Sequence, residues 1–288
     1  MDAPAISQVT VLGAGTMGHG IAQVCAAAGY RTCLFDLRQE LVDNGLSRIR
    51  KNLDKGVARG KVSEDKREQT LAHLRGSSEF VEAVSGVDLV IEAVPEKLEL
   101  KQKLFGDAAP HIADTAILAT NTSSLSVAKI AATVPHPERV IGTHFFNPVF
   151  IMKLLEIIVA EQTAPEVVAA IQAFGQCIGK QCITVRDSPG FATSRLGLVI
   201  GLEAIRMVEE GVASPEDIDQ AMCLGYGFPM GPLRLTDLVG LDVRLHIADY
   251  LCAHLPMGAH FAPPQLLRTM VAEGKLGKKS GQGFYTWS

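Results

Sequence analysis

The residues of this chain best suited to acid–base chemistry are His144 and Glu156. Glu156 lies within residues 153–159, where its neighbours on both sides are apolar, and a buried carboxylate is costly unless a cation or hydrogen-bond donors meet it. His144 ends the adjoining predicted strand, so the carboxylate could fix its tautomer and raise its basicity. Such a pair could take the proton of an alcohol while a hydride leaves. An equally open alternative is a loop histidine bonded to backbone, with the glutamate paired to Lys153 or an arginine.

Three further polar residues, Glu96, Ser123 and Asn147, directly follow predicted strands. In doubly wound sheets ligands bind at the carboxyl ends of the strands, so these side chains are candidates for holding a substrate or a cofactor. Ser123 has a second interpretation, as the cap of the helix predicted from Ser126, and caps are the commoner use of serine at such a position. The remaining histidines are scattered, and we predict no metal site.

Residues 8–36 carry the pattern of a dinucleotide-binding turn, a strand followed by GAGTMG, a helix and a second strand. The first glycine makes the tight turn, the second lets the backbone approach a pyrophosphate, and the third lets the helix pack close to the strand. Asp36 could accept both hydroxyls of an adenine ribose and would repel a 2′-phosphate, so the predicted cofactor is NAD rather than NADP. The residues predicted to bind it from this segment are Gly13, Gly15, Thr16, Met17, Gly18 and Asp36.

The elements that must position these residues alternate between strand and helix as far as residue 186. This alternation predicts an α/β fold with a doubly wound, Rossmann-type parallel sheet. From residue 187 onward only helical patterns follow, so we predict an NAD-binding domain over residues 1–186 and a helical substrate and dimerisation domain over residues 187–288. The helical part carries more apolar surface than it could easily bury alone, which favours a homodimer formed through it.

Composition narrows the class of protein further. The chain has 288 residues and a formal charge of -4, which gives no sign of a nucleic-acid partner. No apolar run approaches the length of a transmembrane helix, and the N-terminus resembles neither a signal peptide nor a basic leader. The six cysteines are scattered, so we expect reduced thiols rather than disulfides. We therefore expect a cytoplasmic enzyme without a membrane partner.

A locally basic segment follows Asp36. Lys51, Lys55 and Arg59 are spaced four apart and share one face of a predicted helix. On charge alone a solvated face is the favoured interpretation, and a seat for a phosphate-rich ligand such as coenzyme A is the alternative.

Taken together, these motifs resemble the short-chain 3-hydroxyacyl-CoA dehydrogenases, a family that includes bacterial 3-hydroxybutyryl-CoA dehydrogenases. The resemblance runs nearly end to end, and its most specific motifs are HFFNP at residues 144–148 and the tail at residues 277–285. The other matching stretches are residues 13–18, 121–124, 152–154, 187–191 and 229–232. The family combines a dinucleotide-binding domain with a helical dimerisation domain.

The resemblance implies NAD-dependent oxidation of an L-3-hydroxyacyl-CoA, of short chain such as 3-hydroxybutyryl-CoA, or the reverse reduction. It implies that His144 is the catalytic acid/base and that Glu156 orients it. The residues that it places at the substrate are Ser123, Asn147 and Ser194, with Lys55 and Arg59 at the coenzyme A phosphates. The further residues that it assigns to the cofactor are Glu96, Lys101, Asn121, Ser123, Asn147 and Lys279.

The chain departs from the family at one position. After residues 189–191 the family usually has an asparagine followed by an arginine, whereas this chain has Ser194 and Arg195. Serine could still donate one hydrogen bond near the substrate carbonyl, but its reach is shorter. Losing such a donor could cost on the order of 2–4 kcal/mol in the barrier. We therefore expect lower turnover, or a shifted substrate preference, than in close relatives.

Two alternative functions stay open on the sequence. The first is an NAD-dependent dehydrogenase of a free hydroxy acid such as carnitine or gulonate, but such relatives usually lack the second phenylalanine of HFFNP and the Met-Lys-Leu at residues 152–154. They also need no basic face at Lys55 and Arg59. The second is a weakly active NAD-binding protein with a structural or regulatory role, which only Ser194 supports.

Overall fold

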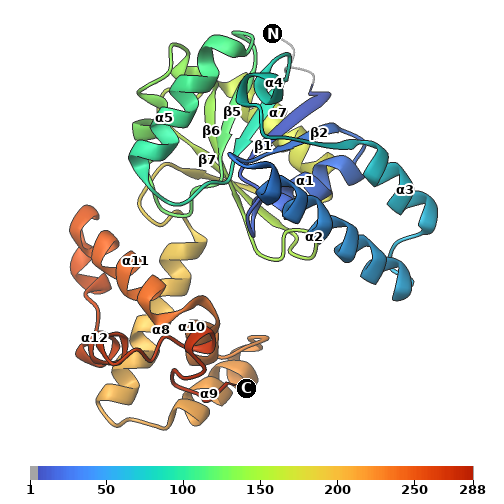
Figure 1. Cartoon of the computed structure of the whole chain (residues 1–288). Coiled ribbons are helices and arrows are strands. Elements are labelled where there is room, and N and C mark those ends of the chain that lie inside the picture. Colours follow the sequence, from blue (N-terminus) through green and yellow to red (C-terminus); the bar gives the residue numbers. More distant parts are fainter. Residues whose placement is uncertain (1–5, 288) are drawn as a thin grey trace. The chain divides into compact units, whose positions relative to one another are not determined.

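The structure is a computed structural model that describes residues 6–287. The chain divides into two compact units, Met1–Asp187 and Ser188–Ser288 (Figure 1). The first unit is built on one β-sheet with flanking helices, and the second is helical.

The sheet of the first unit has eight strands in the order β3-β2-β1-β4-β5-β6-β7-β8. The strands are β1 (Gln8–Leu12), β2 (Arg31–Phe35), β3 (Leu74–Ser77), β4 (Leu89–Glu92), β5 (Ile117–Thr120), β6 (Val140–Phe145), β7 (Leu154–Val159) and β8 (Gln181–Arg186). The predicted doubly wound parallel sheet is confirmed with one exception, because β6 and β7 are antiparallel. The connection over residues 146–153 is too short for the crossover that a parallel pair requires.

The helices of this unit are α1 (Gly18–Ala27), α2 (Gln39–Ala58), α3 (Glu64–Ala72), α4 (Phe80–Val84), α5 (Leu98–Ala108), α6 (Val127–Ala131) and α7 (Pro165–Cys177), with short 3-10 turns η1 (Ala109–His111) and η2 (Pro137–Arg139). Apolar strand residues such as Val11 and Ile91 pack against helix residues such as Ile21 and Ile171 in one core. Every residue of β4 and β5 is buried, which explains why their sequences are apolar without alternation.

Two short elements were not predicted. Helix α3 begins with the Ser63 hydroxyl accepting from the Lys66 N–H and ends at Ala72, and β3 follows at once. This edge strand contains an arginine and a glycine and only Ser77 is buried, so it lacks the apolar pattern of a strand. Helix α4 is likewise too short to show a period.

The second unit consists of α8 (Thr193–Glu209), α9 (Pro215–Tyr226), α10 (Pro232–Val239), α11 (Leu241–His254) and α12 (Gln265–Ala272), with 3-10 turns η3 (Gly258–Phe261) and η4 (Lys278–Ser280). The predicted all-helical character is confirmed for the described residues of this unit. Its own core includes Leu202, Ile205, Leu233, Leu251 and Leu267. Throughout residues 6–287, every helix is too short or too polar to cross a bilayer.

Candidate active site

The Gly-rich loop between β1 and α1 has the geometry that its sequence predicts. Gly13 has φ 103°, its N–H donates to the Phe35 carbonyl at 2.8 Å, and an added Cβ would lie 2.9 Å from the Ala93 carbonyl oxygen. At Gly18 a Cβ would lie 1.7 Å from the Gly13 carbonyl oxygen, so only glycine allows this helix-to-strand contact. Gly15 is exposed, and an added Cβ there would meet nothing within 4 Å. The backbone at Gly15 is therefore open to a ligand.

Asp36, at the end of β2, belongs to the same loop. One carboxylate oxygen accepts from the Ala14 N–H at 2.8 Å, and the other accepts from the Leu37 N–H at 2.8 Å. These two bonds hold the carboxylate beside the Gly-rich turn. Thr16 is exposed in the turn, and Met17 is the residue before α1 begins. The loop thus offers backbone donors for a pyrophosphate and a carboxylate for a ribose.

Glu96 organises the segment that follows β5. Its Oε1 accepts hydrogen bonds from the Thr122 hydroxyl at 2.6 Å and from the backbone N–H groups of Ser123 at 2.8 Å and Ser124 at 3.1 Å. The neighbouring Asn121 ties this segment to β6, because its Oδ1 accepts from the Phe145 N–H at 2.9 Å. Glu96, Asn121 and Ser123 therefore lie together at the carboxyl ends of the central strands.

Lys101 lies behind this segment and is fully buried. Its ammonium donates to Glu92 at 2.7 Å and forms an ion pair with Glu96 at 3.3 Å. Burial acts to raise the pKa of Glu96, but Lys101 and the hydrogen bond from Thr122 outweigh it and hold that pKa below its usual value. At Glu92 burial dominates and raises the pKa. The ammonium of Lys101 is enclosed between Glu92 and Glu96, and its contact with the cofactor stays a prediction.

His144 and Glu156 face each other across the antiparallel pair of β6 and β7, as direct partners in the register. The Nδ1 of His144 lies 2.7 Å from Oε2 of Glu156. Glu156 is fully buried, whereas His144 keeps 8% of its surface exposed. With Nδ1–H donating to the carboxylate, Nε2 carries a lone pair that can accept a proton. Of the two arrangements that the sequence left open, the structure has the His144–Glu156 pair.

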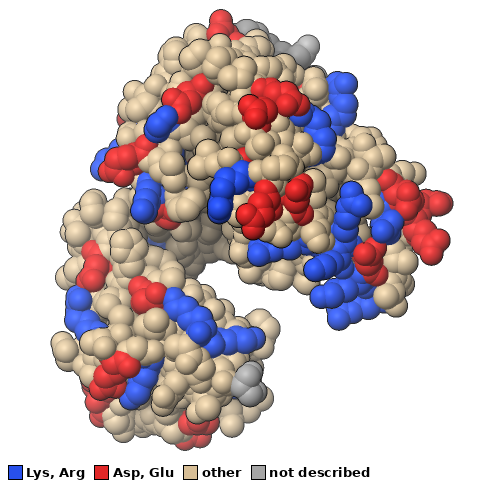
Figure 2. All heavy atoms as spheres, viewed as in Figure 1, with Lys and Arg blue, Asp and Glu red and all other residues tan. Residues whose placement is uncertain are grey.

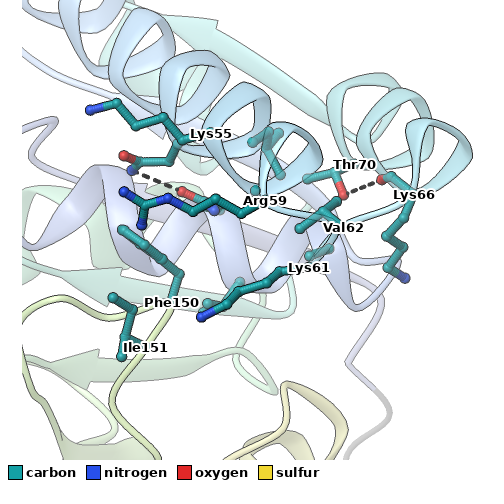
Figure 3. A pocket seen from close by; sticks show the side chains of 14 residues that line it. Lys55, Arg59, Lys61, Val62, Lys66, Thr70, Phe150 and Ile151 are labelled. Carbon is teal, nitrogen blue, oxygen red and sulfur yellow. Dashed lines mark hydrogen bonds between the residues drawn. The ribbon is translucent and has the colours of Figure 1, made fainter.

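A pocket of about 570 Å³ lies where α1, α2 and α3 meet the β6–β7 connection. Figure 3 shows Arg59 between the end of α2 and the turn that carries Phe150 and Ile151. Figure 2 shows positive side chains gathered on the α2 side of this unit. The basic residues lining the pocket are Lys55, Arg59, Lys61 and Lys66. The pocket thus combines positive charge with an apolar wall.

Lys180, which the sequence analysis did not single out, holds the turn beside this pocket. It is buried, and its ammonium donates to the Val149 carbonyl and, at 2.7 Å, to the Met152 carbonyl. Burial, with a smaller contribution from nearby Lys153, lowers the pKa of Lys180. The only sequence signal is a lysine directly before a strand, which is common at surfaces. Asn147 is exposed in the same turn.

The second unit contributes two predicted site residues. Ser194 lies in the first turn of α8. Lys279 lies in η4 and pairs with Asp242 at 2.5 Å. Burial acts to raise the pKa of Asp242, but the hydrogen bond from Lys279 outweighs it and lowers that pKa.

Comparison with known proteins identifies the family. Residues 8–188 match the family model "3-hydroxyacyl-CoA dehydrogenase, NAD binding domain", and residues 190–287 match "3-hydroxyacyl-CoA dehydrogenase, C-terminal domain". The chain belongs to the 3-hydroxyacyl-CoA dehydrogenase family. It is therefore an oxidoreductase acting on a CH–OH group, and its cofactor is NAD.

Individual relatives agree with this assignment. A 3-hydroxybutyryl-CoA dehydrogenase of Mycobacterium tuberculosis is 43% identical over 98% of this chain and 99% of the relative. A 3-hydroxyadipyl-CoA dehydrogenase of Escherichia coli is 41% identical, and the match covers 98% of this chain and 59% of that longer protein. The crystal structure of the (S)-3-hydroxybutyryl-CoA dehydrogenase PaaH1 from Ralstonia eutropha has a TM-score of 0.95 at 39% identity, covering 99% of this chain and 100% of that one.

Proposed function

We propose that this family member oxidises a short-chain L-3-hydroxyacyl-CoA, such as 3-hydroxybutyryl-CoA, to the 3-oxoacyl-CoA, or catalyses the reverse reduction, with His144 as acid/base. The observation that carries the proposal is the hydrogen bond of 2.7 Å between His144 and the buried carboxylate of Glu156. Proton exchange with the substrate hydroxyl would use the other imidazole nitrogen, Nε2.

In the proposed reaction, Nε2 of His144 takes the hydroxyl proton as a hydride leaves C3 of the substrate. Hydride acceptance is the chemistry that NAD supplies. The imidazolium that forms on His144 is stabilised by the carboxylate of Glu156. In the reductive direction the same imidazolium returns the proton. Ser194 donates a hydrogen bond to the substrate oxygen, and Ser123 and Asn147 lie beside the substrate and the nicotinamide.

The residues of the Gly-rich loop suit the cofactor. The open backbone at Gly15 and the start of α1 could receive the pyrophosphate, and Asp36 could accept the ribose hydroxyls. We propose that Glu96 and Asn121 complete this site from the β4 and β5 ends and that Lys279 contributes from the second unit.

The basic pocket is the proposed seat of the coenzyme A moiety. Lys55 and Arg59 line it together with the apolar side chains of Phe150 and Ile151, so phosphate groups and the less polar parts of coenzyme A would both find suitable contacts. If the basic face of α2 were only a solvated surface, its positive charge would be explained. The presence of a pocket lined by that face would not.

Substitution of the two basic residues tests this assignment. In Lys55→Ala/Arg59→Ala we expect the KM for acetoacetyl-CoA to rise about 10- to 100-fold, because charge-assisted hydrogen bonds to phosphate are lost. The kcat and the KM for NADH should change little. Lys103→Ala, which removes an exposed lysine of α5, is the matched control. An unchanged KM for the thioester, or equal turnover of free acetoacetate, would show that the site is not built for coenzyme A.

We also propose a cytoplasmic homodimer formed through the helical unit. Large apolar side chains such as Leu224 (83% exposed) and Tyr226 (79% exposed) are uncovered within that unit. All six cysteines are free thiols, which fits a reducing compartment. Sedimentation that gives a monomer at micromolar concentration would contradict the dimer, and cell fractionation tests the location.

A further inference from the structure

Glu92, the last residue of β4, is a second fully buried carboxylate of the first unit. Its Oε1 accepts from the Val94 N–H at 2.7 Å, and its Oε2 accepts from the Thr120 hydroxyl at 2.7 Å. The ammonium of Lys101 donates to both oxygens, at 2.7 and 2.9 Å. The side chain of Glu92 therefore ties the end of β4 to β5 and to α5.

Stability alone does not explain this charge. An ion pair enclosed between strand and helix loses its hydration, and an apolar pair of similar volume is often as stable or more stable. The other residues of β4, Leu89, Val90 and Ile91, are apolar and buried. A fourth apolar residue would suit such a strand, so the carboxylate at its end indicates a role in holding other groups in place.

Lys101 extends the contact from Glu92 to Glu96. Its ammonium lies 3.3 Å from Oε2 of Glu96, which is farther than from either oxygen of Glu92. Glu92 therefore anchors the ammonium, and the ammonium in turn holds Glu96. The other oxygen of Glu96 accepts from the backbone N–H groups of Ser123 and Ser124. A continuous chain of contacts thus leads from the buried Glu92 to Ser123.

Glu92 also holds the start of the same segment. Its backbone carbonyl accepts from the Asn121 N–H at 2.7 Å, and the Thr120 hydroxyl, at the end of β5, donates to its carboxylate. Residues 121–124 are therefore held at their first residue by Glu92 directly and at Ser123 through Lys101 and Glu96.

We propose that Glu92 is a positioning residue of the reaction, which fixes residues 121–124 so that Ser123 meets the substrate and the nicotinamide in a productive geometry. This inference rests on the proposed function, in which Ser123 lies beside both. The carboxylate of Glu92 is enclosed and acts only through its neighbours. A misplacement of about 1 Å at a reacting group can lower a rate on the order of 100-fold, so a distant residue of this kind affects kcat.

Glu92→Gln tests the inference because it keeps the shape of the side chain and removes its charge. The measured quantity is kcat per NADH-binding site with saturating acetoacetyl-CoA and NADH, so that unfolded enzyme is not counted. We expect kcat to fall by about 10- to 100-fold. The KM for the thioester should change by less than about threefold, because the basic pocket is untouched. Glu99→Gln, at an exposed position of α5, is the matched control and should keep the wild-type kcat.

A comparison in the Ser123→Ala background separates positioning from a structural role. If Glu92 acts through Ser123, the fall in kcat caused by Glu92→Gln should be at least about threefold smaller in that background than in the wild-type enzyme. A fall closer than that to the wild-type one would overturn the inference. So would a fall of less than about tenfold in Glu92→Gln alone.

Thr120→Val keeps the inference testable even if Glu92→Gln does not fold. This variant removes one hydrogen bond of Glu92 and leaves its pair with Lys101 in place. We expect kcat to fall by about threefold or more, and by less in the Ser123→Ala background. A smaller fall, or equal falls in both backgrounds, would overturn the inference. Absence of acetoacetyl-CoA turnover by the wild-type enzyme would instead contradict the proposed function.

Discussion

The carboxylate of Glu156 is enclosed by apolar residues of the sheet, where an ionised group is stable only if donors meet it. The antiparallel register places His144 directly opposite, and the bond of 2.7 Å supplies such a donor. The same contact fixes the ring orientation of His144. One interaction therefore accounts both for the tolerance of a buried acid and for the orientation of the imidazole.

Replacing the carboxylate of Glu156 by an amide keeps the shape of the side chain and removes its charge, so the variant measures what the charge contributes to catalysis. In Glu156→Gln we expect kcat to fall by about 100- to 10,000-fold, because the imidazolium loses its countercharge and the ring its preferred tautomer. The KM for the thioester should change little, since Glu156 lies behind His144. Steady-state kinetics on Glu156→Gln and on the control Glu161→Gln, an exposed position after β7, measure this directly. A kcat within about threefold of wild type would leave Glu156 with a structural role alone.

Individual residues differ in how far their surroundings can be predicted. Glu156 is detectable because a charge interrupts an otherwise apolar strand, and the loop glycines because their spacing is tied to turn geometry. The resemblance to the family assigned Lys101 to the cofactor, but its burial between two glutamates depends on how α5 packs on β4. Arg244 lies in a helix of mixed composition, and only the packing of α8 and α10 against it shows that its Nε has no hydrogen-bond partner among residues 6–287.

At the scale of elements, the β6–β7 connection links the proposed catalytic pair to the basic pocket. Its turn carries Asn147 next to the proposed catalytic pair, and Phe150 and Ile151 at the pocket. Lys180 reaches this turn from the start of β8 and binds two of its carbonyls. The conformation of the turn thus depends on a residue outside it.

Removing the ammonium of Lys180 should loosen the turn without touching a ligand. In Lys180→Met the buried Val149 carbonyl and the part-buried Met152 carbonyl lose their donor. An unsatisfied buried acceptor costs about 1–3 kcal/mol, so we expect a lower Tm. The KM for the thioester should rise several-fold, while NADH affinity, which depends on the β1–α1 loop, should stay the same. Thermal melts and isothermal titration on Lys180→Met and on Lys129→Met, an exposed control on α6, provide the measurement. Equal effects on thioester and NADH binding would contradict a role confined to this turn.

Element prediction succeeded where local chemistry and packing agree. The β1–α1–β2 segment has apolar strands, a glycine turn and a helical period, and all three are present in the structure. Strand β3 is defined by its pairing with β2 and not by its own composition, so its sequence carried no signal. The antiparallel β7 has the composition of a parallel buried strand, and only the short connection before it indicates its direction.

For the whole molecule, the proposed functions are distributed over two units. The first contains the cofactor loop, the His144–Glu156 pair and the basic pocket, and the second contains Ser194. The change of pattern near residue 187 predicts that a helical part follows. Which of its apolar side chains remain exposed could not be predicted, because burial within the unit is decided by how its helices pack.

The central claim is that His144 transfers the proton in a reaction specific for a CoA thioester and NAD. The most direct measurement is the rate of NADH oxidation with acetoacetyl-CoA, compared with free acetoacetate and with NADPH, for the wild-type enzyme and His144→Ala. We predict turnover only with the thioester and NADH, reduced by about 100-fold or more in the variant, while the variant still binds NADH. Equal rates for wild type and His144→Ala, or faster turnover of free acetoacetate, would contradict it.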